Sequence, residues 1–146
     1  MKTIRSFLAV LMAGTLLLAI SYPVRAELKS PQSVKGALRV LNQVVGHTGR
    51  LVAAKDYDRV GGEHGEFTEG AAMLREAIAN EPADFKAKVE TALTEAVNAS
   101  AALGTVGVTK DDDKLSAAHT AFAAKVKTVL ELFPEDLRPK PRTPQK

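Results

Sequence analysis

Cysteine and tryptophan are absent from this 146-residue chain, and aromatic residues make up only 5% of it. Without cysteine the chain has no disulfide scaffold, no thiolate metal site, no cysteine nucleophile and no covalent attachment of a c-type haem. Apolar residues still account for 45% of the chain and charged residues for 25%, which is enough apolar content for one folded domain. Any function must therefore use other side chains.

Motifs of the common enzyme classes are also missing. The chain contains no P-loop, no Gly-x-Ser-x-Gly, no His-Glu-x-x-His and no dinucleotide-binding fingerprint. Glu63 and Glu66 flank His64, but there is no Glu-x-x-His pair of the ferritin-like di-iron type. We therefore expect no catalytic residue, no dedicated metal-ligand motif and no enzymatic activity.

The first 26 residues have the pattern of a secretory signal peptide. Lys2 and Arg5 precede an apolar run at 7–20, and small or apolar residues at 24–26 suit a signal peptidase. The run of about 14 residues is shorter than the roughly 20 that a membrane-spanning helix needs. We expect cleavage after Ala26 and a periplasmic or secreted protein.

Removal of this segment leaves a chain of balanced charge. Lys2, Arg5 and Arg25 are three of the 20 basic residues, and none of the 17 acidic residues precedes residue 27. Residues 27–146 thus carry 17 charges of each sign, and the basic pI of about 9.2 belongs mostly to the removed segment. This balance argues against a nucleic-acid or membrane-surface partner. The expected partner is an unknown protein or small ligand.

Hydrophobic spacing predicts an all-α fold. Apolar residues recur at three- and four-residue steps, as on the buried stripe of an amphipathic helix. The short links favour an antiparallel, up-down-up-down four-helix bundle over residues 27–133, after the cleaved signal peptide 1–26. The Pro-rich residues 134–146 are predicted to form a flexible tail. The four predicted helices span 31–55, 58–80, 82–103 and 111–133.

Local signals predict where these helices begin and end. Ser30 before Pro31 is the expected N-cap of the first helix, and Thr109 that of the last. The stretch 104–107, with glycine at both ends, is expected to end the third helix. The second helix should start irregularly and approach a neighbouring backbone closely, because its first half contains four glycines, Gly61, Gly62, Gly65 and Gly70.

Three histidines are the candidate ligands for a cofactor. His64 and His119 lie on the apolar stripes of their helices, and His47 lies beside the stripe of the first helix. In an alternating bundle all three stand near the same end, where facing helices can build a haem or transition-metal site. The competing interpretation is that each is a buried or half-buried imidazole hydrogen-bonded to a neighbour.

Two stretches carry a family resemblance. One is VGHTGRLVAAKDYD at residues 45–58, and the other is VKTVLELFPEDLR at residues 126–138. They resemble the end of the first helix and the last helix of the cytochrome c′-like family, which are exported four-helix bundles. Where that family carries Cys-x-x-Cys-His, this chain has Val126, Val129 and Leu130. The resemblance implies the fold and the export, and it allows a homodimer, but the family's haem chemistry does not carry over.

These observations lead to two functional hypotheses. The first is an exported, haem-less, cytochrome c′-like bundle with a binding or structural role and no cofactor. The alternative is a bundle that binds non-covalent haem or a transition metal through His47, His64 and His119, for electron transfer or sensing. The two differ in whether the three rings meet.

Overall fold

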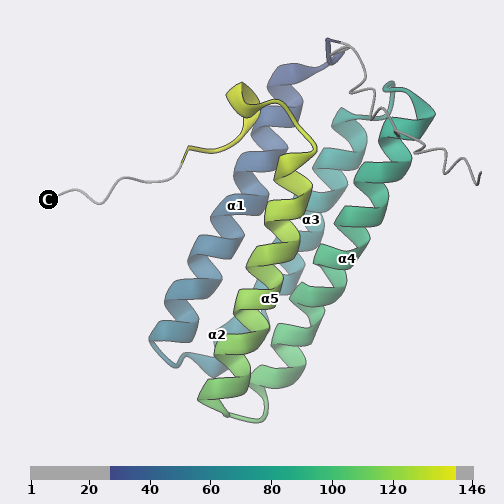
Figure 1. Cartoon of the computed structure of the whole chain (residues 1–146). Helices are drawn as coiled ribbons and strands as arrows, with labels where there is room; N and C mark the ends of the chain where they lie inside the picture. The colour runs from purple at the N-terminus through teal and green to yellow at the C-terminus, as the bar shows by residue number, and fades with distance from the viewer. Residues whose placement is uncertain (1–26, 141–146) are drawn as a thin grey trace, which may run out of the picture.

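The computed structural model describes residues 27–140, and 79% of these residues are helical, with no strand among them. Figure 1 shows four long helices lying alongside one another, with a short helix and a 3-10 turn at opposite ends. The long helices are α1 (Pro31–Ala53), α3 (Glu63–Ala77), α4 (Ala83–Gly107) and α5 (Asp112–Glu131). The short elements are α2 (Tyr57–Val60) and η1 (Glu135–Leu137). The all-α prediction is therefore confirmed.

The remaining predictions about the ends of the chain fall partly outside this range. The predicted signal peptide, 1–26, and residues 141–146 of the predicted tail are not among the described residues. Between residues 27 and 140, no helix combines the length and the apolar character needed to cross a bilayer.

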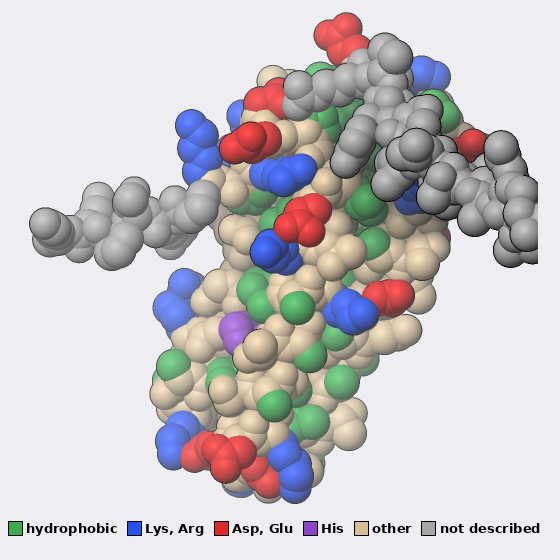
Figure 2. Space-filling model, viewed as in Figure 1, with side chains coloured by type: hydrophobic (Ala, Val, Ile, Leu, Met, Phe, Trp, Pro, Cys, Tyr) green, Lys and Arg blue, Asp and Glu red, His purple; other side chains and the backbone are tan. Residues whose placement is uncertain are grey.

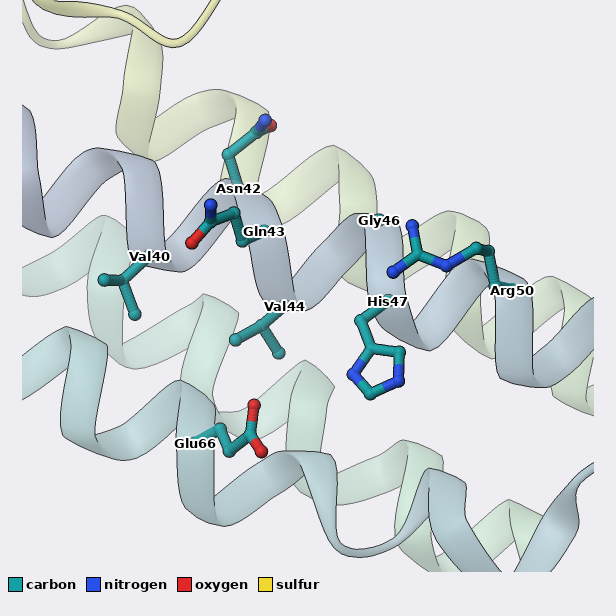
Figure 3. Close-up of a pocket in the computed structure, with 8 residues that line it drawn as sticks. All are labelled: Val40, Asn42, Gln43, Val44, Gly46, His47, Arg50 and Glu66. Carbon is teal, nitrogen blue, oxygen red and sulfur yellow. The ribbon is translucent and has the colours of Figure 1, made fainter. Parts of the chain in front are cut away.

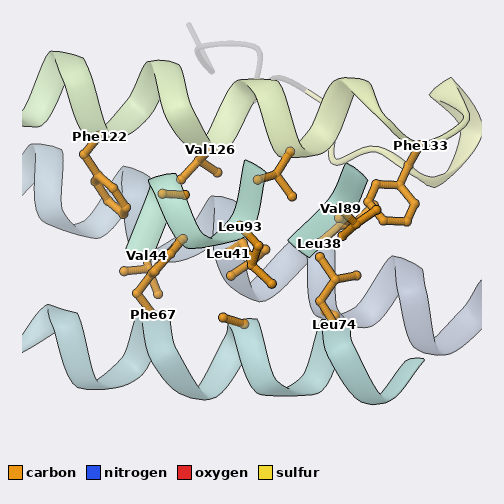
Figure 4. Close-up of a cluster of buried hydrophobic side chains, with 14 of the residues drawn as sticks. Leu38, Leu41, Val44, Phe67, Leu74, Val89, Leu93, Phe122, Val126 and Phe133 are labelled. Atoms are coloured by element: carbon orange, nitrogen blue, oxygen red, sulfur yellow. The ribbon is translucent and has the colours of Figure 1, made fainter. Parts of the chain in front are cut away.

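Each long helix packs against two others. Helix α1 contacts α3 and α5, and α4 contacts the same two helices. The side chains on the inward faces fill the space between them (Figure 4). Two aromatic pairs pack edge to face in this core: Phe67 with Phe122, at a ring-centre distance of 4.9 Å, and Phe85 with Phe133, at 5.5 Å. This geometry suits the charge distribution of aromatic rings.

The second predicted helix, 58–80, is divided in two. Helix α2 ends at Val60, and Gly61 and Gly62 form a turn before α3 begins at Glu63. The backbone of Gly61 lies against α4, since a Cβ atom built on Gly104 would stand 3.5 Å from the Gly61 Cα. The close approach expected from the glycine-rich sequence is therefore confirmed at this position.

Helix α4 continues past its predicted end. Gly104 lies within the helix, where it faces the backbone of Gly61, and Gly107 is the last helical residue. A Cβ atom on Gly107 would stand 3.3 Å from the carbonyl oxygen of Tyr57. The helix ends after Gly107, and Lys110 then takes a left-handed conformation with φ 53°. Gly104 thus marks a helix contact, whereas Gly107 is both a close contact and the end of the helix.

The C-terminus of α1 is closed by a Schellman motif. Lys55 adopts φ 58°, its amide donates to the Val52 carbonyl, and the Asp56 amide donates to the Leu51 carbonyl. The Lys55 ammonium and the Tyr57 hydroxyl both donate to the Asp112 carboxylate at the start of α5. Figure 2 shows acidic and basic side chains gathered at this end of the molecule.

The predicted N-cap position of the first helix is confirmed, and that of the last helix is wrong. Ser30 occupies the N-cap position of α1, but its side chain makes no capping hydrogen bond. Thr109 closes α4, with its hydroxyl donating to the Val106 carbonyl. Asp111 caps α5 instead, because its carboxylate accepts from the Lys114 amide at 3.1 Å.

The first residues of the predicted tail belong to the packed structure. Leu137 in η1 is only 8% exposed, and η1 packs against α1. The Arg138 guanidinium donates to the carbonyl oxygens of Phe133 and Glu131, at 2.8 and 3.0 Å. These carbonyls stand at the end of α5, where backbone acceptors lack helical partners. The packed domain thus extends to Arg138 and does not end at Phe133.

The contact between Lys55 and Asp112 makes a predictable contribution to acid stability. Hydrogen bonds from Lys55 and then Tyr57 hold the pKa of the Asp112 carboxyl below its usual range. A carboxyl whose pKa is lowered in the folded state stabilises the fold at pH values above its ordinary pKa. This stabilisation is lost as the pH falls through the lowered, folded-state pKa. Asp112→Asn should lower the melting temperature at pH 7, and the difference from the parent should shrink as the pH falls below the ordinary pKa of an aspartate.

The control for this experiment is Asp113→Asn, one residue further along the same exposed helix turn. It removes the same charge from the start of α5 without removing a hydrogen bond from Lys55 or Tyr57. Equal melting temperatures for the two variants at pH 7 would refute the role given to Asp112.

A pair of glycine substitutions tests the packing of α3 against α1. A Cβ atom on Gly70 would stand 2.9 Å from Val40 Cγ1 and 3.0 Å from Leu41 Cδ2, whereas one on Gly36 would meet nothing within 4 Å. Gly36→Ala should raise the free energy of unfolding by roughly 0.5–1 kcal/mol. Gly70→Ala should lower it by about 1 kcal/mol, because overpacking outweighs helix propensity. Urea denaturation measures both, and stabilisation by Gly70→Ala would contradict this packing.

Candidate functional site

The structure gives each of the three candidate histidines a different partner. His47 Nδ1 lies 3.0 Å from Glu63 Oε2, and His64 Nδ1 lies 2.7 Å from Ser100 Oγ. His119 Nε2 donates to the carbonyl oxygen of Val45 at 3.1 Å. Only His47 belongs to a cluster of side chains able to hold a metal ion. The three rings therefore do not make one ligand set in this structure.

His119 has a packing role between α5 and α1. Its ring lies over Gly49, where a Cβ atom would stand 3.0 Å from His119 Cε1. The hydrogen bond to Val45 requires the proton on Nε2, because a carbonyl oxygen only accepts. The lone pair of a neutral His119 ring is thus on Nδ1. This matches the interpretation of the residue as a half-buried, hydrogen-bonded imidazole.

His64 points toward α4 and not toward His47. Its Nδ1 partner is the hydroxyl of Ser100, which is buried and donates its own proton to the Val97 carbonyl at 2.8 Å. A hydroxyl carries one proton, so the Ser100 oxygen accepts from His64 Nδ1 when it donates to Val97. The contact joins α3 to α4.

The cluster that can hold a metal ion consists of His47, Glu63 and Glu66. One ligand atom from each residue lies within 4.8 Å of the other two. His47 comes from α1, while Glu63 and Glu66 come from the first turn of α3 and are three residues apart. Residues at this spacing share one side of a helix. Imidazole nitrogen and carboxylate oxygen are donors suited to Zn²⁺ and related divalent ions.

Glu63 is the most informative residue of this cluster. It is only 8% exposed, and its Oε2 atom is buried without a hydrogen-bond partner among the described residues. The approach of His47 Nδ1 is close enough for an ion pair, but it does not have hydrogen-bond geometry. An unpartnered buried carboxylate oxygen is costly, and such groups are usually paired or bound to a metal.

The neighbouring hydroxyl groups do not supply a hydrogen bond to Glu63 Oε2. A small internal void is lined by Glu63, Thr48 and Ser100, among others. Both hydroxyls donate to carbonyls of their own helices, Thr48 to Val44 and Ser100 to Val97. Neither has a second proton to offer the carboxylate. A positive charge on the His47 side, 3.0 Å away, would compensate Oε2.

The cluster opens onto a surface groove of about 380 Å³. Figure 3 shows that α1 supplies most of the side chains around it, with Glu66 opposite on α3. Glu66 is exposed and His47 is about one third exposed, so an ion at the cluster is reachable from solvent. The groove is lined by Val40, Asn42, Gln43, Val44, Gly46, His47, Arg50 and Glu66.

Residues at the positions of the family's haem motif have a different setting. Val126 and Val129 are buried in the core between the helices, and Leu130 is half-buried against it. None of them contributes a polar atom to a site. They serve the hydrophobic core at these positions.

The sequence predicts His47 as a ligand together with His64 and His119, whereas the structure places it beside Glu63 and Glu66. Both glutamates flank His64 in a helix whose predicted start is residue 58. The helix carrying them begins at Glu63, which turns Glu63 and Glu66 toward α1 and His64 toward α4. The sequence signal for this cluster is the pair of acidic residues three positions apart, because such residues share one side of a helix and can face His47 on the neighbouring helix.

Comparisons with protein-family models, with curated proteins and with solved structures found no match to this chain. The chemistry of the site therefore rests on its own geometry.

The unpartnered carboxylate leads to a prediction for the metal-free protein. Glu63→Gln removes a buried charge while keeping the size of the side chain, so it should raise the free energy of unfolding by about 1 kcal/mol at pH 8 in the presence of a chelator. Glu69→Gln, an exposed change on the same helix, should be neutral. Urea denaturation measures both. Destabilisation by Glu63→Gln at pH 8 would instead identify a structural ion pair with His47.

Proposed function

We propose that this chain is an exported, non-enzymatic bundle that binds one divalent first-row transition-metal ion at His47, Glu63 and Glu66. The observation that carries the proposal is the buried Oε2 atom of Glu63, which lacks a hydrogen-bond partner and lies 3.0 Å from His47 Nδ1. The proposal keeps the metal-binding alternative raised by the sequence. It replaces His64 and His119 with two carboxylates.

The donor set favours a borderline divalent ion such as Zn²⁺ or Co²⁺. One imidazole and two carboxylates resemble the mixed nitrogen and oxygen sets that such ions accept, and two carboxylates balance the charge of the ion. Three protein ligands leave at least one position open in a tetrahedral site. The partial exposure of His47 and the exposure of Glu66 support entry of the ion from solvent.

The surrounding protein is proposed to be an antiparallel, up-down-up-down bundle of the cytochrome c′-like type. Four long helices, the links between them, and the packing of α1 and α4 against both α3 and α5 support this arrangement. The buried Val126 and Val129 support a haem-less relative, because aliphatic residues at these positions join the core. The basic and apolar residues before Ala26 support export to the periplasm or secretion.

The competing explanation is a structural ion pair between a protonated His47 and Glu63. It accounts for the distance between the two side chains, but not for Glu66, whose carboxylate completes the cluster. The position of Glu66 in the first turn of α3 is also favoured by the helix dipole. Metal affinity separates the two explanations.

Calorimetric titration of the secreted, chelator-treated protein with ZnCl₂ is the test. We expect one ion per chain, and we expect His47→Ala and Glu63→Gln each to weaken binding by at least about 10-fold, because each removes one of three ligands. Glu66→Gln should also weaken it. An absorbance spectrum of protein from haem-replete cells should lack a Soret band.

Glu69→Gln is the matched control, since it makes the same substitution in the same helix outside the cluster. Zinc binding that survives both His47→Ala and Glu63→Gln would refute the assigned ligands. A stoichiometric Soret band would instead support the haem-binding alternative.

A further inference from the structure

The groove beside the metal cluster has features that the metal alone does not explain. His47 and Glu66 both line it, so the unfilled coordination positions of an ion held there face the groove. Gly46 borders open space, because a Cβ atom at this position would meet nothing within 4 Å. The volume of about 380 Å³ lies within the range of small-molecule sites.

Arg50 supplies an uncommitted positive charge to this groove. It lies three residues after His47 on the same side of α1, and Figure 3 shows its guanidinium group beside the groove. No carboxylate in residues 27–140 pairs with it. Arg75, in contrast, is held by a two-pronged contact with Glu90 at 2.8 Å. An unpaired guanidinium is a ready donor to a planar oxyanion.

The other end of the groove carries neutral polar groups. Asn42 and Gln43 both line it, and their side-chain amides offer N–H donors and carbonyl acceptors. In Figure 3 they stand further along α1, on the side away from Arg50. These groups suit a small polar molecule and not an apolar one.

We propose that the groove binds a small carboxylate that occupies the open position of the metal ion and accepts hydrogen bonds from Arg50. This inference rests on the metal site proposed above. The two negative charges of Glu63 and Glu66 balance the two positive charges of a divalent ion. The guanidinium of Arg50 then adds one positive charge, which a single carboxylate neutralises. A phosphate dianion exceeds that charge, and the planar guanidinium group matches a carboxylate. The protein then takes the metal together with a carboxylate ligand.

The probe is acetate, added to the cobalt-loaded, secreted protein. The visible spectrum of Co²⁺ reports a change in its ligands, so saturable change on acetate addition is expected at constant ionic strength. Arg50→Gln should raise the apparent Kd for acetate by about 10-fold or more, which matches the loss of a charged hydrogen bond. Its Kd for Co²⁺ should stay close to that of the parent.

Arg39→Gln is the matched control, since Arg39 is an exposed arginine of the same helix that does not line the groove. Gly46→Leu gives a second variant, which fills the groove from an open position and should abolish the acetate response without loss of Co²⁺. Arg39→Gln should leave the melting temperature near that of the parent, and Gly46→Leu should not lower it, because it removes a glycine from the interior of α1.

The outcomes separate this inference from the metal site itself. Cobalt binding with no response to acetate, or an equal response in Arg50→Gln, would overturn the carboxylate site and leave the metal site standing. A response to inorganic phosphate at lower concentration than to acetate would overturn the choice of carboxylate. Failure of the parent to bind Co²⁺ would overturn both proposals.

Discussion

The close backbone approach between α2 and α4 is the constraint on which the candidate site depends. Gly61, directly after α2, lies against Gly104, and a Cβ atom on Gly107 would stand 3.3 Å from the carbonyl oxygen of Tyr57, closer than ordinary contact. This contact sets where the chain turns and therefore where α3 begins. Consecutive helical residues point about 100° apart. A start at Glu63 consequently directs that side chain to α1 and the next one to α4.

The same constraint places a charged group at the edge of the hydrophobic core. Glu63 lies close to Val44 and Phe122, which line the same internal void, and nearby hydroxyls are committed to their own helices. A carboxylate in such a place lowers the stability of the empty protein. Proteins often retain a cost of this kind where a ligand compensates it. The stability of the bundle and the buried charge of Glu63 are thus opposed.

Periodicity predicted the helices well, because each buries one continuous apolar stripe, but it did not predict how they are related to one another. The apolar stripe of a helix predicts which face is buried. It does not predict which neighbouring helix a side chain at the edge of that face will contact. His47 and His64 were level in the sequence argument, yet they turn to Glu63 and Ser100. The third helix ends at Gly107, within the predicted stretch, but Gly104 lies inside it at a contact with Gly61, since a helix stop and a helix contact use the same residue.

The closure of the bundle by Leu137 and Arg138 has a consequence for the order of folding. Leu137 packs against α1, and Arg138 holds the last carbonyls of α5, so the first long helix is completed by residues about a hundred positions later in the chain. A polypeptide is made from its N-terminus, and contacts of such sequence separation form late. The outer face of α1 near η1 therefore stays open until almost the whole chain has emerged. A ribosome that pauses before residue 137 would hold a bundle that is not yet closed at this end.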